Sequence, residues 1–111
     1  MNTYEHLMEV LAEEGNEVAV RVSKVLRFGP DDIEPGQDLS AIERLEDEIH
    51  DFLGTLVEVV KRKYILPPTN ETKILAKQIK ILDMLNYARS IGTVDDFDDG
   101  SLIDVPYRRG D

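Results

Sequence analysis

The sequence predicts an all-α fold, an antiparallel bundle of three long helices that self-association completes. Of the 111 residues, 41% are hydrophobic but only 6% are aromatic, and the chain has only 7 Gly and 5 Pro. Such a composition favours helices over a β-sandwich or barrel. Three long segments without Pro carry apolar residues at helical spacing, namely residues 3–28, 40–66 and 69–91. The length suits one domain, which we expect over residues 1–92. Residues 93–111 form an acidic tail with too little apolar content to order itself.

The first expected helix covers residues 3–28 and ends before Gly29-Pro30, because Pro cannot continue a helix and Gly tolerates a left-handed cap. At helical periodicity one stripe is expected to be buried, and it comprises Leu7, Leu11, Val18, Val22 and Val25. Glu14 falls inside this stripe and Glu17 lies at its flank. A carboxylate on a core-facing stripe is unfavourable without a partner. We therefore expect something to pair with Glu14.

The second expected helix covers residues 40–66. It begins with the capping-box pattern of Ser40 and Glu43 and ends before a pair of prolines. Its broad apolar face comprises Leu45, Ile49, Phe52, Leu53, Leu56, Val59 and Val60. Glu48 lies at one margin of this face and Asp51 lies beyond it. The acidic residues of the first two helices are therefore expected to face each other.

The third expected helix covers residues 69–91, with Thr69 or Asn70 as its cap and an end near Gly92. Its expected buried residues are Ile74, Leu75, Ile79, Ile81, Leu82 and Leu85. The spacing aligns three basic residues on a different side, Lys73, Lys77 and Lys80. Broad apolar faces on three helices are buried better in a dimer or tetramer, so we expect self-association.

Charge and composition exclude several classes of function. The net charge is −10, from 23 acidic and 13 basic residues, and it repels the phosphate backbone of DNA or RNA. The chain has no Cys, which excludes disulfides and thiolate metal sites and fits the cytoplasm, where we expect the protein. No stretch approaches the roughly 18 apolar residues that span a bilayer, so we expect no membrane association.

Two acidic motifs indicate chemistry. Glu13, Glu14 and Glu17 form an EExxE pattern, and Glu48 and Asp51 form ExxD. Residues three apart share one helical face. Their hard oxygen ligands suit Mg²⁺, with Mn²⁺ as an alternative, together with water and substrate phosphates. Each motif alone also occurs on solvated acidic helices, so the combination carries the interpretation.

The combination resembles the MazG-like family of all-α nucleoside triphosphate pyrophosphohydrolases, whose signature is EExxE followed by ExxD on the next helix. Residues 24–29 and 44–53 are similar to the small single-domain members found in phages and bacteria, and the resemblance covers residues 7–91. It departs from the family in the 30 residues (18–47) between the motifs, at or slightly above the usual range, and in His50, where a small residue is common. A longer loop costs little free energy.

This resemblance implies a site and a reaction. The implied metal ligands are Glu14, Glu17, Glu48 and Asp51. Glu13 would be a supporting carboxylate, and either Glu13 or Glu17 is the candidate general base for the attacking water. The substrate would be a (deoxy)nucleoside triphosphate, cut between its α and β phosphates to a monophosphate and pyrophosphate. Family members of this kind commonly form homodimers or homotetramers.

Basic residues must meet the substrate phosphates, and the candidates are Lys24, Arg27, Lys77 and Lys80. Each also fits an ordinary solvent-exposed position. His50 lies inside ExxD, but a lone His on a helix is usually structural. Two alternatives stay open: a narrower dUTP or dCTP pyrophosphatase, and a non-catalytic helical bundle whose acidic residues only keep an interaction protein in solution.

Overall fold

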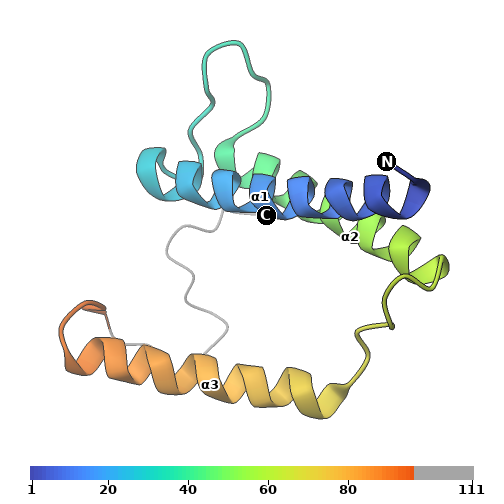
Figure 1. The fold of residues 1–111 in the computed structure, drawn as a ribbon. Helices are drawn as coiled ribbons and strands as arrows, with labels where there is room; N and C mark the ends of the chain where they lie inside the picture. Colours follow the sequence, from blue (N-terminus) through green and yellow to red (C-terminus); the bar gives the residue numbers. More distant parts are fainter. Residues whose placement is uncertain (97–111) are drawn as a thin grey trace. The chain divides into compact units, whose positions relative to one another are not determined.

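The computed structural model describes residues 1–96, and these residues form three α-helices and no strand (Figure 1). The helices are α1 (Thr3–Phe28), α2 (Ala41–Lys61) and α3 (Glu71–Ser90). The all-α prediction is confirmed. No helix within residues 1–96 is long and apolar enough to cross a membrane. Of the predicted acidic tail, residues 97–111 lie outside the described part of the chain.

The described chain divides into two units. Met1–Leu66 contains α1 and α2, which pack side by side and run in opposite directions (Figure 1). Residues 67–96 contain α3. The antiparallel packing of α1 and α2 brings residues near the middle of α1 next to residues near the middle of α2, which is the pairing that positions the acidic motifs.

Helix α1 has the predicted bounds because both of its ends carry local signals. Asn2 and Glu5 form a capping box, in which the Asn2 side chain accepts a hydrogen bond from Glu5 N at 2.8 Å. At the other end Gly29 adopts φ 94°, and its N–H donates to Val25 O at 2.9 Å. Most of the predicted stripe is partly buried, but Val22 is 40% exposed. The prediction for Val22 is wrong, since packing against α2 alone covers a narrower stripe.

Helix α2 begins as predicted at the Ser40 capping box but ends at Lys61, five residues before the predicted end at 66. The N–H of Lys63 donates to Val60 O at 2.9 Å and that of Tyr64 to Val59 O at 3.0 Å. These two bonds form a Schellman motif, which needs a left-handed residue, and Lys63 takes φ 62° although it is not Gly. The predicted end was wrong because no Gly marks this stop.

The loop between α1 and α2 is attached to the start of α2. Ala41 N donates to Asp32 O at 2.8 Å and Ile42 N donates to Pro30 O at 2.9 Å. Further along, Gln37 N donates to Glu34 O at 2.9 Å, with Pro35 and a Gly at φ 85° as the central residues. This is the pattern of a type II turn. Glu34 is therefore held at the start of a defined turn.

Helix α3 is capped by Asn70, whose side chain accepts from Lys73 N at 3.1 Å, and it ends before Gly92 at φ 81°. It contains no buried residue. Five of the six residues predicted to be buried are 51–57% exposed: Ile74, Leu75, Ile79, Ile81 and Leu82. This burial prediction is wrong for the single chain, because an apolar stripe is buried only where a facing surface covers it.

Candidate metal centre

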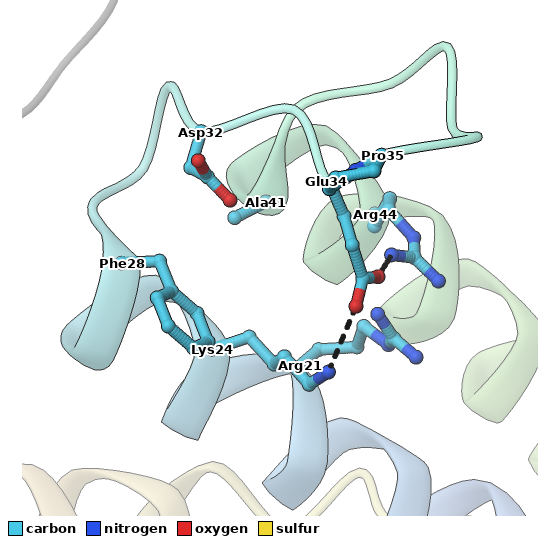
Figure 2. A pocket seen from close by; sticks show the side chains of 8 residues that line it. All are labelled: Arg21, Lys24, Phe28, Asp32, Glu34, Pro35, Ala41 and Arg44. Atoms are coloured by element: carbon cyan, nitrogen blue, oxygen red, sulfur yellow. Dashed lines mark hydrogen bonds and ion pairs between the residues drawn. The ribbon is translucent and has the colours of Figure 1, made fainter.

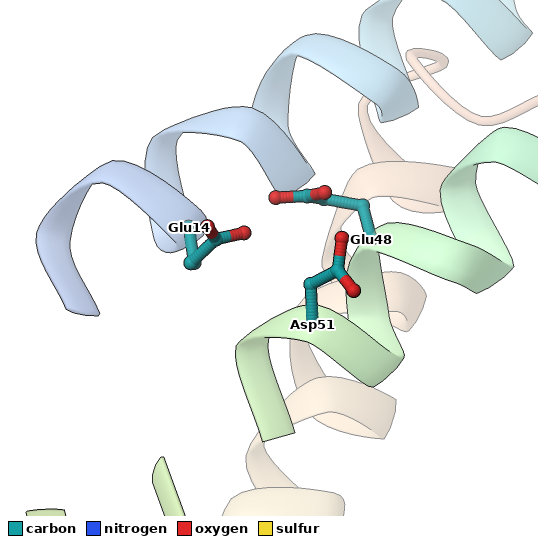
Figure 3. A group of neighbouring side chains, drawn as sticks. All are labelled: Glu14, Glu48 and Asp51. Carbon is teal, nitrogen blue, oxygen red and sulfur yellow. The ribbon is translucent and has the colours of Figure 1, made fainter. Parts of the chain in front are cut away.

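Three carboxylates meet between α1 and α2. Glu14 comes from α1, and Glu48 and Asp51 come from α2, where their spacing of three puts them on one face. One oxygen of each lies within 4.8 Å of the other two. Figure 3 shows the three side chains converging from the two helices. The geometry is what a shared cation requires, with ligands supplied by both helices.

Glu48 has the most perturbed environment of the three. Its Oε1 atom is buried and has no hydrogen-bond partner. Ionised carboxylates have no proton to donate to each other, so this oxygen needs a shared proton, a cation or a water molecule as its partner. A proton shared with Glu14 is the largest cause that raises the pKa of Glu48 to about 7, and burial, the charge of Glu14 and the proximity of Asp51 add to it.

A groove of about 480 Å³ begins at Glu14 and Asp51. Its other lining residues are Leu7, Val10, His50, Gly54, Thr55 and Glu58. Nδ1 of His50 lies 2.8 Å from the carbonyl oxygen of Glu46, one turn earlier in α2. This bond anchors the imidazole to its own helix, as a structural role for His50 predicts. The groove gives a bound molecule access to the carboxylates.

The structure does not bring the other two acidic candidates into the cluster. Glu17 accepts two hydrogen bonds from Arg21, from Nε at 3.2 Å and from Nη2 at 2.9 Å. Glu13 is exposed on α1. Both hydrogen bonds go to Oε1 of Glu17, so the residue that the resemblance implies as a fourth ligand is paired with Arg21.

Two of the predicted phosphate-binding residues lie on α1 and two lie on α3. Lys24 forms an ion pair with Glu34 at 3.4 Å. The guanidinium of Arg27 stacks over the ring of Phe28, 4.8 Å from its centroid. Lys77 and Lys80 are exposed on α3, where they line a depression of about 660 Å³. Of the four, Lys24 lines a pocket together with other charged side chains, among them Arg44 and Glu34.

This basic pocket was not predicted from the sequence. The pocket, about 280 Å³, lies between the end of α1, the start of α2 and the loop (Figure 2). Its charged lining includes Arg21, Lys24 and Arg44, and Glu34 reaches into it from the loop. The sequence holds one indication of it. Arg21 follows Glu17 by four residues and Arg44 precedes Glu48 by four, so each arginine shares a helical face with an acidic residue of the motifs.

Comparisons of the chain with models of known protein families, with curated proteins and with solved structures found no match. The MazG-like resemblance therefore stays a prediction from the motifs. The arrangement of the side chains is the basis for the function proposed below.

Proposed function

We propose that the protein is a Mg²⁺-dependent nucleoside triphosphate pyrophosphohydrolase, which releases a nucleoside monophosphate and pyrophosphate. One observation carries this proposal: Glu14, Glu48 and Asp51 converge, and Glu48 Oε1 is buried among them without a donor. An acidic face that serves only solubility would place its carboxylates in solvent, away from one another.

The three carboxylates fit a hard divalent cation. Mg²⁺ prefers carboxylate oxygens and keeps several waters and phosphate oxygens as its other ligands, so three side chains suffice. Mn²⁺ accepts the same donors. When bound, such an ion neutralises phosphate charge and lowers the pKa of an attacking water. Glu14, Glu48 and Asp51 would hold it between α1 and α2.

The remaining predicted residues would bind and orient the substrate. Glu13 and Glu17 are the candidates for accepting the proton of the attacking water, since both lie on α1 beside Glu14. Arg21 engages only Oε1 of Glu17, so Oε2 would be the oxygen that accepts this proton. Positive charge for the β and γ phosphates would come from Lys24, Arg27, Lys77 and Lys80, which counter the repulsion between an acidic protein and an anionic substrate.

Self-association is part of this proposal. Most large apolar residues of α3 are more than half exposed in the single chain, and burying them in a homodimer or homotetramer would remove this surface from water. The absence of Cys fits the reducing cytoplasm, which we expect as the compartment.

A substrate panel tests the reaction. Each ribonucleoside and deoxyribonucleoside triphosphate, with dUTP included, is incubated with protein and Mg²⁺, and the products are separated by chromatography. We expect monophosphate and pyrophosphate, with loss of turnover in a folded Glu48→Ala variant and retention in the matched neighbour Asp47→Asn. Diphosphate with free phosphate, or full activity of Glu48→Ala, would refute the assignment. Turnover confined to dUTP or dCTP would identify the narrower enzyme.

A melting experiment separates the enzyme from the non-catalytic alternative. A cation that binds only the folded protein stabilises it by about 2.7 kcal/mol at a hundredfold excess over Kd. Mg²⁺ should therefore raise the Tm of the wild type more than NaCl at equal ionic strength, and the gain should shrink in Asp51→Asn. Equal shifts by Mg²⁺ and NaCl in both proteins would favour the interaction protein.

A further inference from the structure

The basic pocket has a net positive lining in a protein whose overall charge is strongly negative. Arg21, Lys24 and Arg44 contribute three cations, whereas Asp32 and Glu34 contribute two carboxylates. Arg21 is also paired with Glu17, which does not line the pocket, so Lys24 and Arg44 are the cations that face into it with Glu34 as their partner. An anion is the ligand that such a site attracts from solution.

Glu34 already occupies the pocket as an internal anion. Its Oε2 accepts a hydrogen bond from Arg44 Nη1 at 2.8 Å, and its Oε1 accepts one from Lys24 Nζ at 3.4 Å. Figure 2 shows its carboxylate between these two residues, which come from different helices. Hydrogen bonds to Arg44 and Lys24 lower the pKa of Glu34, as expected for a carboxylate held by cations.

The contacts of Glu34 are replaceable. The side chain is 45% exposed and hangs from the loop, whereas the cations of Arg44 and Lys24 are anchored on α2 and α1 and are 22% and 30% exposed. Exposed ion pairs of this kind contribute little to stability. A phosphoryl group offers more acceptor oxygens than a carboxylate and engages guanidinium groups in pairs of hydrogen bonds.

We propose that the basic pocket binds a phosphoryl anion, and that Glu34 holds the place of this anion until the ligand displaces it. Arg44 and Lys24 are the direct ligands. Arg21 lines the same pocket and joins them when it releases Glu17. The type II turn at Glu34 fixes where the carboxylate returns after the ligand leaves.

The pocket lies next to the candidate metal centre along the helix pair. Arg44 precedes Glu48 by four residues, about 6 Å along α2. The anion is either free pyrophosphate or phosphate, or the phosphate end of a nucleotide that also reaches the carboxylates. The second source rests on the proposed function, but binding of a phosphoryl anion by the pocket does not.

Calorimetric titration with inorganic pyrophosphate in EDTA tests the pocket alone. The Glu34→Gln variant removes the internal competitor and should bind pyrophosphate about fivefold more tightly than the wild type. Adding Arg44→Gln to Glu34→Gln should weaken binding about tenfold or more. Glu9→Gln, an equal change of charge at an exposed position of α1, is the matched control and should change affinity less than about twofold.

The proposal is overturned if Glu34→Gln and Glu9→Gln change the affinity equally, or if folded Glu34→Gln binds no pyrophosphate. Circular dichroism of each variant confirms folding. The source of the anion is read from a second titration, with Mg²⁺ and a nucleotide analogue that carries a non-hydrolysable α-β linkage. Loss of analogue binding in both Asp51→Asn and Arg44→Gln identifies a nucleotide that reaches both sites, whereas loss in Asp51→Asn alone identifies a free anion as the ligand of the pocket. Because the first titration uses no metal, failure of the proposed enzyme activity leaves its result unaffected.

Discussion

The pKa of Glu48 makes the stability of the metal-free protein depend on pH. This carboxyl has an ordinary pKa of 4.5 in the unfolded chain and a pKa of about 7 in the folded chain. Below pH 4.5 the group is protonated in both states and has no effect on the pH dependence of stability. As pH rises to about 7, the unfolded chain loses this proton first, so the free energy of unfolding falls with pH.

The size of the effect follows from the two pKa values. At 1.36 kcal/mol for each pKa unit, the difference between 4.5 and about 7 corresponds to about 3 kcal/mol at full ionisation. Solvent reaches part of the side chain and screens the repulsion, so we expect a loss of about 1–3 kcal/mol above the folded pKa. Gln cannot ionise. The Glu48→Gln variant should therefore equal the wild type near pH 4.5 and exceed it in stability by this amount near pH 8.

The assay is urea unfolding followed by far-UV circular dichroism, in EDTA, across this pH range. Asp47→Asn removes a neighbouring exposed carboxylate of α2 and is the control for a general change of charge. A gain that grows with pH in Glu48→Gln but not in Asp47→Asn supports the reasoning. A constant difference between Glu48→Gln and wild type, or the same growing gain in Asp47→Asn, would refute it.

Four further predictions concern stability and metal binding. Gly54 lies inside α2, and a Cβ atom at this position would meet nothing within 4 Å, so Gly54→Ala should raise the free energy of unfolding by about 1 kcal/mol in urea titrations. Lys63→Gly should relieve the left-handed backbone and leave stability equal or higher by about 0.5–1 kcal/mol, whereas a clear loss would contradict that strain. Ser40→Ala removes a buried helix cap and should lower the Tm, at a cost of about 1–2 kcal/mol. If Glu17 is a metal ligand, Arg21→Gln should tighten Mn²⁺ binding by up to about twofold, measured by calorimetry, because it removes the ion pair of Glu17. Unchanged Mn²⁺ affinity in both Arg21→Gln and Glu17→Gln would exclude Glu17 as a metal ligand.

Local signals decided how well the helices were predicted. The bounds of α1 were predicted correctly because its C-terminal stop, Gly29-Pro30, is written in the sequence. The cap of α2 at Ser40 was predicted for the same reason. The end of α2 was not, because Lys63 takes a conformation that sequence patterns associate with Gly. Burial was predicted less well than helix formation, since it depends on which surface faces each helix.

Part of the acidic cluster could be predicted from the sequence. Spacing of three on one helix and an antiparallel partner suffice to predict that Glu14, Glu48 and Asp51 converge. Spacing cannot decide between two partners for one side chain, and Glu17 lies four residues from Arg21 as well as three from Glu14. The position of Glu34 depends on the turn that follows it and on two backbone hydrogen bonds between the loop and α2. Helical periodicity predicts neither the turn nor these hydrogen bonds.

The charges along α1 and α2 favour one class of ligand over the alternatives. A carboxylate oxygen without a donor lies at Glu48 beside Glu14, and cations that hold replaceable carboxylates lie further along the helix pair, at Arg21 and Arg44. A cation alone would satisfy only the carboxylates, and an anion alone only the arginines. A metal ion that carries a phosphate ligand satisfies both groups at once, because its positive and negative parts lie side by side as the two groups do. The layout of charge is therefore the one that the proposed function requires of its ligand, a phosphate bound to a metal ion.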